Sequence, residues 1–535
     1  MTLNPNVYEP RTNTSWVTVM EHRYALVSVY DKEGVIAFSK ELSNLGITIL
    51  STGGTAAFFS KAGIPFKDVS EVTGFPEMLD GRVKTLHPII HAGILARRDN
   101  KKHLKVLKEL KINLIDFVVC NLYPFEKTIQ KQNVSIEEII ENIDIGGPTL
   151  IRAAAKNYKD VVVITSPKQY KEILSILKSK KEITLKQREK LAIEAYAHTA
   201  QYDSIISQYL RNRWTNEILP QDYTISMRKI QEMRYGENPH QKGAFYKAIP
   251  ATRESCVSNA EQLHGKELSF NNILDADCAI ECVKEFREPS CVIIKHATPC
   301  GIASSSTLLQ TWIDAYATDI YSPYGGIVAF NRELPKDVAQ ELSKYYLEVI
   351  IAPGFSKDAR AILSEKKNLR LLELKGLEKE SKRKGLDVRS VVGGFLVQER
   401  DVWFGDQKTW KIVTKIKPTN EDLISMGFAV KCVKHVKSNS VVFVKGTRTV
   451  GIGGGQTSRV DATWIATHKG KDHIKESIMA SDAFFPFRDA VDVAVNAGVK
   501  AIIQPGGSIH DEEVIQAANE HGISMVFTGQ RYFRH

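Results

Sequence analysis

Short apolar runs alternate with helical stretches along most of the chain, and this alternation restricts the fold more than any other feature. Residues 24–29 have the length and composition of a buried strand, and apolar residues then recur at helical spacing until Gly46. Residues 47–50 form a second apolar run, and after a Gly-rich turn a helix is expected from Ala56 to Gly63. Repeated strand and helix units of this kind are typical of α/β proteins.

The same pattern continues to the end of the chain. A capping box at Ser135 and Glu138 predicts a helix through Asn142, and a long helix is expected over residues 185–211. Further strands are expected at 116–120, 160–165, 292–294, 326–330, 347–352, 440–444, 501–503 and 524–527. We therefore predict a mobile tail over residues 1–20, a first domain over 21–211, a linker over 212–231 and a larger second domain over 232–535.

Composition excludes several classes of protein. A chain of 535 residues is too long for one core, and 43% apolar with 25% charged residues is ordinary for a soluble protein. No apolar run approaches the roughly 18 residues of a membrane helix, and no signal peptide precedes the first strand, so a cytoplasmic location is expected. Seven cysteines without a CxxC pair make no disulfide framework, and Cys278 and Cys282 are expected in the core.

The formal charge of +10 indicates anionic partners or serves only solubility. Nucleic acid is not favoured, because no long Lys/Arg run is interleaved with aromatic residues. The basic patch at 379–385 is expected to be an exposed loop. Small acidic substrates fit this charge distribution.

Residues 291–303, CVIIKHATPCGIA, place Lys295 and His296 near the end of an apolar run. In open α/β sheets ligands bind beyond the carboxyl ends of the strands. Adjacent side chains on a strand face opposite ways, so both can reach one pocket only at a turn, for which Thr298-Pro299 is the candidate. Taken alone, a Lys-His pair is more often structural or solvated than catalytic.

Several polar loops of the first domain follow predicted strands. Residues 51–55, STGGT, join a strand to a helix, which gives either an anion site at the helix N-terminus or an ordinary tight turn. Residues 81–88, GRVKTLHP, gather two cations, a hydroxyl and a histidine, and Arg82 and Lys84 suit phosphate and a developing oxyanion. Tyr123 also lies in a polar loop after a strand, although Tyr-Pro is a common turn. One pocket can collect such loops at consecutive strand ends.

Asp144 precedes a helix that carries Arg152 and Lys156. Asp144 is alternatively a partner of the helix end, and Lys156 is alternatively a surface cation.

The second domain carries other polar motifs. Residues 234–240, RYGENPH, combine a cation, an aromatic ring and two proton-transfer groups in one loop. Residues 451–456, GIGGGQ, fail the dinucleotide fingerprint, and the preceding KGTR indicates a hairpin, which excludes a nicotinamide site. Residues 481–489, SDAFFPFRD, form either core packing or a platform for a flat ligand. His296 with Cys300 lacks the Glu and second Cys of zinc deaminases, so no catalytic metal is expected.

Taken in order, the motifs GRVKTLHP, NLYPF, IDIGGPTLIRAAAKN, RYGENPHQ, IIKHATPCG, SNS, GIGGGQTSR and SDAFFPFRD resemble one family over about residues 22–535. It is the family of bifunctional purine biosynthesis enzymes that combine phosphoribosylaminoimidazolecarboxamide formyltransferase with IMP cyclohydrolase, and the sequence is similar to the bacterial form. The resemblance implies a methylglyoxal synthase-like first domain and a transferase domain of two cytidine deaminase-like halves without zinc. It also implies a homodimer with transferase sites at the subunit interface, 10-formyltetrahydrofolate as co-substrate, and no nucleic-acid or membrane partner.

The resemblance also implies roles for individual residues. The catalytic residues implied are Lys295, His296 and Asn439 for formyl transfer, and Lys84, Tyr123, Asp144 and Lys156 for ring closure. The substrate-binding residues implied are Thr52, Gly53, Gly54, Thr55, Arg82, Thr85, Asn121, Arg234, Tyr235, Asn272, Arg459, Phe485 and Arg531. Tyr30 departs from the family, which usually has Ser beside Asp-Lys.

The chemistry agrees with these residue types. The weakly nucleophilic 5-amino group of the ribotide must lose a proton as it attacks the formyl carbon, and histidine is the residue type that exchanges protons near neutral pH. Lys295 would stabilise the oxyanion or protonate the leaving folate nitrogen. The alternative is a regulator that senses purine ribotides without turnover, but binding phosphate needs no proton-shuttling histidine.

Overall fold

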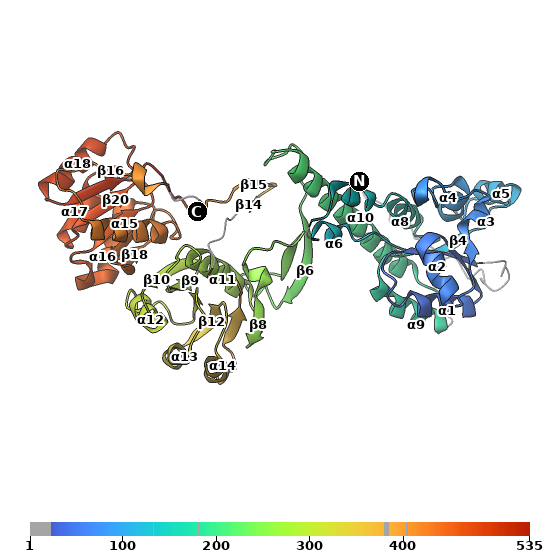
Figure 1. The fold of residues 1–535 in the computed structure, drawn as a ribbon, viewed down its shortest axis with the longest axis horizontal. Helices are drawn as coiled ribbons and strands as arrows, with labels where there is room; N and C mark the ends of the chain where they lie inside the picture. Colours follow the sequence, from blue (N-terminus) through green and yellow to red (C-terminus); the bar gives the residue numbers. More distant parts are fainter. Residues whose placement is uncertain (1–22, 132, 180, 379–384, 403–404) are drawn as a thin grey trace, which may run out of the picture. The chain divides into compact units, whose positions relative to one another are not determined.

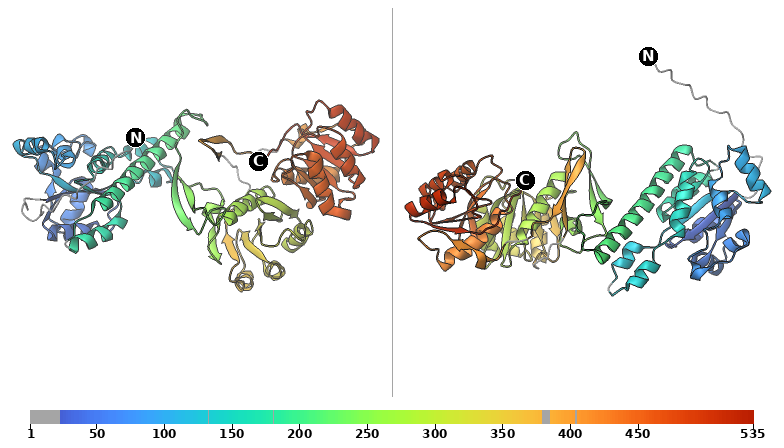
Figure 2. Two further views of the ribbon diagram at one scale, coloured as in Figure 1. Left: turned by 180° about the vertical axis from the view of Figure 1, so that it is seen from behind. Right: turned by 90° about the horizontal axis from the view of Figure 1, so that it is seen from above.

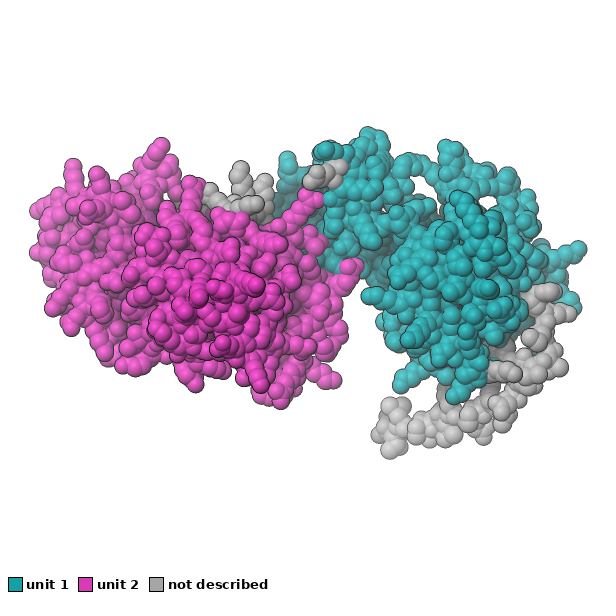
Figure 3. All heavy atoms as spheres, turned by 60° about the horizontal axis from the view of Figure 1, so that its bottom comes forward, with its two compact units in different colours: residues 1–226, 248–250 teal, residues 227–247, 251–535 magenta. Residues whose placement is uncertain are grey.

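The computed structural model describes residues 23–535 except 132, 180, 379–384 and 403–404. The expected tail and residues 379–384 of the basic patch therefore lie outside the described residues. The chain divides into two compact units, coloured in Figure 3. Unit 1 comprises residues 1–226 and 248–250, and unit 2 comprises residues 227–247 and 251–535.

Unit 1 contains a five-stranded sheet in which each strand is parallel to its neighbours. Its strands are β1 (Arg23–Val29), β2 (Ile47–Ser51), β3 (Lys67–Asp68), β4 (Ile115–Asn121) and β5 (Val162–Ile164), in the order β3-β2-β1-β4-β5. The apolar runs predicted from sequence thus form neighbouring parallel strands, which requires the helical crossovers that the sequence places between them.

The helices of unit 1 are α1 (Val35–Asn44), α2 (Gly53–Lys61), α3 (Val69–Thr73), α4 (Pro88–Leu95), α5 (Lys101–Glu109), α6 (Phe125–Ile129), α7 (Ile136–Glu141), α8 (Gly146–Lys156), α9 (Tyr170–Lys178) and α10 (Leu185–Trp214). Ser135 caps α7 by accepting a hydrogen bond from the Glu138 N–H, which is one half of the predicted capping box. The long predicted helix is α10, which continues three residues beyond Arg211 and is seen from two directions in Figure 2.

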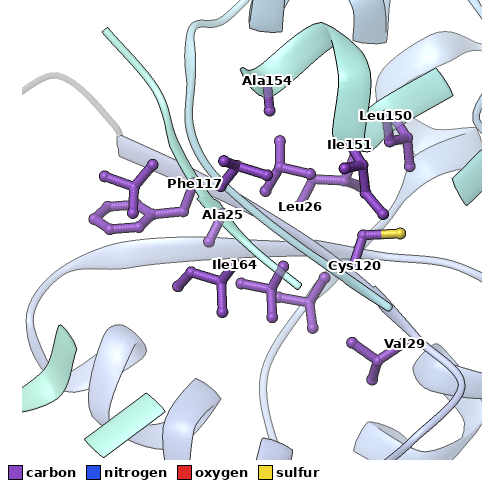
Figure 4. Packing of buried hydrophobic residues seen from close by; sticks show 14 of the residues in the cluster. Ala25, Leu26, Val29, Phe117, Cys120, Leu150, Ile151, Ala154 and Ile164 are labelled. Atoms are coloured by element: carbon purple, nitrogen blue, oxygen red, sulfur yellow. The ribbon is translucent and has the colours of Figure 1, made fainter. Parts of the chain in front are cut away.

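The core of unit 1 lies between the sheet and its helices. Figure 4 shows Leu26 of β1 beside Ile151 of α8, with Ala154 nearby and Ile164 of β5 in the same cluster. Leu26, Ile151 and Ala154 are fully buried. Full burial of such side chains contributes about 1.5–3 kcal/mol each, so this packing fixes α8 on the sheet.

Unit 2 contains a twelve-stranded sheet in the order β16-β21-β20-β19-β17-β18-β10-β9-β11-β12-β13-β8. Figure 1 labels several of its strands, among them β9, β10, β18 and β20. Its strands are β8 (Glu261–His264), β9 (Ser290–Lys295), β10 (Thr298–Ser304), β11 (Gly326–Phe330), β12 (Leu347–Ala352), β13 (Arg370–Glu373), β16 (Lys411–Ile412), β17 (Val441–Lys445), β18 (Arg448–Gly453), β19 (Ile478–Ser481), β20 (Ala501–Gln504) and β21 (Ser524–Phe527). The predicted KGTR hairpin is confirmed, because β17 and β18 pair antiparallel around it.

The two halves of this sheet repeat one another. The helices of the first half are α11 (Phe270–Val283), α12 (Leu308–Tyr316), α13 (Lys336–Leu342) and α14 (Lys357–Ser364). Those of the second half are α15 (Asn420–Val433), α16 (Arg459–Gly470), α17 (Asp489–Asn496) and α18 (Asp511–Glu520). The order α11-β9-β10-α12-β11-α13-β12-α14-β13 recurs as α15-β17-β18-α16-β19-α17-β20-α18-β21. The halves meet where β10 pairs antiparallel with β18, and the α/β fold with two similar halves agrees with the sequence prediction.

Two hairpin sheets were not anticipated from sequence. One is formed by β6 (Ser226–Met233) and β7 (Gly243–Ile249), the other by β14 (Leu386–Val391) and β15 (Gly394–Glu399). β6, β14 and β15 are mostly exposed and β7 is mostly half-buried, so none of the four shows the alternation of buried and exposed residues that identifies a strand. The strand β6 begins within the segment 212–231 that was expected to be a linker.

Candidate active sites

The sheet of unit 1 has a topological switch between β1 and β4. Chain order runs outward in one direction from β1 through β2 to β3, and in the other from β4 to β5. A crevice at the carboxyl edge is expected at such a switch. The predicted loops after β2 and β4, which carry Gly53 and Tyr123, begin at this edge.

The N-terminus of α2 is the first element of the unit 1 site. Thr52 is the N-cap residue, but its side chain makes no capping hydrogen bond. Gly53 has φ +54°, and a Cβ atom there would lie 2.7 Å from Nζ of Lys84. The ammonium group therefore lies directly beside the free N–H groups of the helix, which is an arrangement that favours an anion.

A second contact orients Lys84. Its Nζ lies 3.3 Å from Oε1 of Glu77, and both side chains are partly exposed. Lys84, Glu77, Thr52 and Gly53 line one cavity of about 610 Å³. The cavity places a cation and a helix N-terminus against open space large enough for a small anionic ligand.

Asp144 is the second element of the unit 1 site. Its Oδ1 accepts a hydrogen bond from the Gly147 N–H at 2.8 Å. Burial raises the pKa of Asp144, while backbone hydrogen bonds from Gly147 and Tyr123 oppose part of this rise. The Asp144 N–H donates to the hydroxyl of Tyr202 at 2.8 Å, and burial raises the pKa of Tyr202 to about 12. Asp144 is thus a held, partly desolvated carboxylate of the kind that accepts protons.

Tyr123 is exposed beside Tyr30. Their ring centroids are 5.4 Å apart with an interplanar angle of 57°. The N–H groups of Tyr30 and Asp31 donate to Oδ1 of Asn121 at 2.7 and 2.8 Å. The side chain of Asn121, which was predicted to bind substrate, holds the loop after β1 and so fixes Tyr30 beside Tyr123.

Three further predicted residues of unit 1 lie close to this edge in different states. The Thr55 hydroxyl is buried and bonded to both backbone groups of Val29, at 3.1 and 3.0 Å, so it ties α2 to β1. Thr85 is buried, and a Cβ atom at Gly146 would lie 3.1 Å from its Oγ1, which places Thr85 at the start of α8. Arg82 is exposed and paired with Glu141.

The structure does not bring Lys156 to this edge. Asp144 precedes α8, whereas Lys156 is its last residue and is exposed. A helix of eleven residues is about 16 Å long. The next residue, Asn157, donates to the carbonyl of Ala96 at 3.1 Å, just beyond the carboxyl end of α4.

In unit 2, Lys295 and His296 lie at a tight hairpin between β9 and β10. His296 and Ala297 have φ values of +51° and +55°, which are those of a two-residue type I′ turn. Thr298 and Pro299, the candidate turn of the sequence analysis, instead belong to β10, so that prediction was wrong. Residues other than glycine are strained at positive φ, so His296 and Ala297 keep this conformation only because other contacts hold them.

Asp275 on α11 supplies those contacts. Its Oδ2 accepts from the His296 N–H at 3.1 Å and its Oδ1 from the Ala297 N–H at 2.6 Å. Burial raises the pKa of Asp275, and these two backbone hydrogen bonds oppose the rise. The result is that the His296 side chain is exposed on a fixed turn. Lys295, next to it, donates from Nζ to the carbonyl of Tyr324 at 2.6 Å.

Asn439 belongs to a second cluster at the start of β17. Its Nδ2 donates to the Gln456 carbonyl at 3.0 Å, and its Oδ1 accepts from Nη2 of Arg459 at 2.8 Å. Arg459 is buried and also bonds Asp482 and the carbonyl of Phe484. Arg459 was predicted to bind substrate, but most of its donors are used to build the site around Asn439.

Two of the other predicted substrate-binding residues of unit 2 are buried. Asn272 is buried within the capping box of α11 and donates to Oε2 of Glu348 at 2.7 Å, and Phe485 is fully buried in the core, so neither presents a free surface. Of the three phenylalanines of SDAFFPFRD, Phe484 and Phe487 are the exposed ones.

Arg234 and Arg531 are exposed cations beside aromatic rings. The guanidinium of Arg234 lies 5.9 Å from the ring centroid of Tyr235, and that of Arg531 lies 4.3 Å from the centroid of Phe533. The loop of Arg234 contacts α11, because Asn271 donates to the Glu237 carbonyl at 3.4 Å. Among the described residues no hydrogen bond or ion pair joins Asn439 directly to His296.

Sequence reasoning missed Asp275, Glu77 and Tyr202, which hold His296, Lys84 and Asp144. Asp275 and Tyr202 lie 21 and 58 residues from their partners. Glu77 is close to Lys84 in sequence but lies outside the motif GRVKTLHP. Asp482 lies within the motif SDAFFPFRD, but the motif did not indicate that it pairs with Arg459. Helical spacing identifies which face of a helix is apolar, but not which distant loop a carboxylate on that helix will bond.

Cys300 is buried, and its Sγ lies 3.6 Å from the Ile293 carbonyl. Burial raises the pKa of Cys300 to about 12, which disfavours the thiolate that a metal requires. Within the described ranges, no three His, Cys, Asp or Glu side chains gather as a metal site would need. The part of the chain that the structure describes also contains no helix long and apolar enough to cross a membrane. Cys278 and Cys282 lie in the core, as predicted.

The fold and the two clusters define a two-unit α/β enzyme with one candidate centre in each unit. A family model described as "AICARFT/IMPCHase bienzyme" matches residues 154–469, and one described as "MGS-like domain" matches residues 34–149. The chain therefore belongs to the AICARFT/IMPCHase bienzyme family, and the prediction from its motifs is confirmed.

Relatives that match over nearly their full length support the same family. The chain is 52% identical over 511 residues to the bifunctional purine biosynthesis protein PurH of Acetivibrio thermocellus, covering 96% of this chain and 99% of that protein. It is 51% identical over 518 residues to the PurH protein of Persephonella marina, covering 96% and 100%. A regulator without catalysis is not supported by these matches.

Proposed function

We propose that this chain catalyses the last two steps of IMP synthesis, with formyl transfer in unit 2 and ring closure in unit 1. In the first step the 5-amino group of 5-amino-1-(5-phospho-D-ribosyl)imidazole-4-carboxamide takes the formyl group of 10-formyltetrahydrofolate. In the second, the carboxamide nitrogen attacks the formyl carbon and water leaves. The observation that carries the proposal is the Lys295-His296 pair on a turn fixed by Asp275.

For formyl transfer, His296 is the base. The amino nitrogen forms a bond to the formyl carbon, the amine proton passes to His296, and the bond from that carbon to N10 of the folate breaks. N10 then takes up a proton. Lys295 stabilises the tetrahedral oxyanion or supplies that proton, and its bond to the Tyr324 carbonyl keeps the ammonium beside His296. Asn439, whose amide is oriented by Arg459, holds the substrate amide or His296.

For ring closure, the geometry favours Lys84 and Asp144 with Tyr123. Lys84 and the N-terminus of α2 face a common cavity, which suits the ribotide phosphate or a developing oxyanion. Asp144 accepts a proton from the attacking amide, and Tyr123 donates toward the departing oxygen. Lys156 is far from Asp144 along α8, so a direct role for it in the same centre is the part of the sequence proposal with least support.

Other parts of the proposal rest on the family resemblance. They are a homodimer with transferase sites at the subunit interface, 10-formyltetrahydrofolate as formyl donor, no catalytic metal, no nucleic-acid partner and a cytoplasmic location. The domain boundaries proposed remain 21–211 for the cyclohydrolase and 232–535 for the transferase.

The test is to assay both half reactions on the purified chain. His296→Ala should lower formyl transfer by roughly 10²-fold or more, the usual worth of a positioned acid-base group, and leave closure of supplied formylated ribotide intact. Lys84→Ala should do the reverse. If each variant instead lowers both activities equally while remaining folded, the division of labour between the units is wrong.

A further inference from the structure

The C-terminal tail, residues 528–535, lies on the loop that carries Asn439. The Ser438 N–H donates to the Arg534 carbonyl at 2.9 Å, and the Tyr532 N–H donates to the Asp482 carbonyl at 2.8 Å. Tyr532 is almost fully buried. The tail is therefore anchored to the second half of the unit 2 sheet through its backbone.

The side chain of Arg534 points to the first half. Its Nη2 donates to Sγ of Cys278 on α11 at 3.2 Å, and its Nη1 lies 3.1 Å from Nδ1 of His435. Burial lowers the pKa of His435 to about 4, so its ring is neutral near pH 7. Nε2 lies 2.9 Å from Oε1 of Glu285, so it carries the ring proton and Nδ1 accepts from Arg534. The His435 ring, one of the two acceptors of the guanidinium, is thus oriented by Glu285.

The α11 end of this connection is close to the transferase turn. Cys278 follows Asp275 by three residues, so both lie on one face of α11 about one turn apart. Asp275 in turn holds the N–H groups of His296 and Ala297. Arg534 therefore joins the loop of Asn439 to the helix that fixes His296.

We propose that Arg534 is a positioning residue for formyl transfer, which sets the Asn439 loop against the α11 helix that holds the Lys295-His296 turn. This inference rests on the proposed function of unit 2. Formyl transfer needs groups from both halves of the sheet, and displacements of about 1 Å in such groups lower rates by up to about 10²-fold. The effect should therefore fall on kcat more than on the KM for either substrate.

The experiment compares full-length variants in both half reactions. Arg534→Met keeps the length of the side chain and removes its donors, and it should lower the kcat of formyl transfer about tenfold. Arg389→Met is the matched control, because Arg389 also bonds the tail, at the His535 carbonyl, but through β14. It should stay within about twofold of the wild type. Ring closure, measured on the same preparations, should not change.

The partner residue gives an independent arm that also covers a failure of Arg534→Met to fold. Cys278→Ser keeps an acceptor and should retain formyl transfer, whereas Cys278→Val removes it and should match Arg534→Met. The double variant Arg534→Met/Cys278→Val should be no slower than Arg534→Met alone, because both substitutions remove the hydrogen bond between Arg534 and Cys278. Additive losses, or a wild-type kcat in Arg534→Met or Cys278→Val, would overturn the positioning role. Absence of formyl transfer in the wild-type chain would instead refute the proposed function.

Discussion

The carboxylate of Asp275 should control formyl transfer although it is not expected to touch substrate. It accepts hydrogen bonds from His296 and Ala297, which both adopt left-handed backbone conformations. Hydrogen bonds to charged groups contribute about 1.5–3 kcal/mol each, so the pair supplies about 3–6 kcal/mol. The left-handed conformation costs a residue with a Cβ atom roughly 1–2 kcal/mol, or about 2–4 kcal/mol for the two residues. The turn is therefore stable only while the carboxylate is present.

Asp275→Ala removes both hydrogen bonds and leaves the strain, so the turn should relax and His296 should lose its fixed position. A loss of about 2.7 kcal/mol in the transition state corresponds to a rate lower by about 10²-fold, and we expect at least this fall in the kcat of formyl transfer. Asp275→Asn keeps one acceptor oxygen and should show an intermediate loss of about tenfold. The measurement is single-turnover formyl transfer, with ring closure by the same sample and circular dichroism as controls.

A rescue variant separates the turn from other effects of the mutation. Glycine adopts positive φ without steric cost, so Ala297→Gly added to Asp275→Ala should recover about 1–2 kcal/mol, or roughly tenfold in rate. If Asp275→Ala transfers formyl at the wild-type rate, or if Ala297→Gly restores none of the lost rate, the hydrogen bonds to Asp275 do not position His296 and the reasoning fails.

Three further results are expected. Gly53→Ala should lower kcat/KM for ring closure about tenfold or more, because the new Cβ would lie 2.7 Å from Nζ of Lys84. The control Gly63→Ala has a similar positive φ but open space around it, so it should lower kcat/KM only by the effect of backbone strain. Equal losses in both variants would contradict the Lys84 contact. The raised pKa of Asp144 means that its carboxylate takes up a proton at a higher pH than an ordinary Asp does. The rate of ring closure should therefore fall on acidification with an apparent pKa above 3.8. If the residual rate of Asp144→Asn still falls on acidification in the same way, Asp144 is not the source of this pH dependence. Dialysis against a chelator should leave formyl transfer unchanged, and activity that is lost and then restored by zinc would show that a metal was overlooked.

Most of the fold followed from the sequence, because buried strands and amphipathic helices leave a local pattern. The runs at 326–330, 347–352 and 524–527 coincide with β11, β12 and β21, since each is a short, mostly apolar segment that is mostly buried in the sheet. The hairpins β6–β7 and β14–β15 left no such pattern, because few of their residues are buried. The pairing of β10 with β18, which joins the two halves, depends on residues about 145 positions apart and has no local signal.

The site followed the sequence only where side-chain type was enough. Lys295 ends β9, and His296 lies in the turn that follows it. Asp144 lies just before α8, and Lys84 lies in the loop before α4, as the motifs indicated. The carboxylates and hydroxyls that fix them do not: Asp275 reaches His296 across 21 residues, and Tyr202 reaches Asp144 across 58. Phe485 is fully buried, and its motif could not reveal this, because a phenylalanine among charged residues has the same sequence signal whether its ring faces solvent or the core. A motif thus identifies the groups that react, whereas the rate depends on partners that only the tertiary structure brings to them, and Asp275 and Arg534 are the positions where this distinction can be measured.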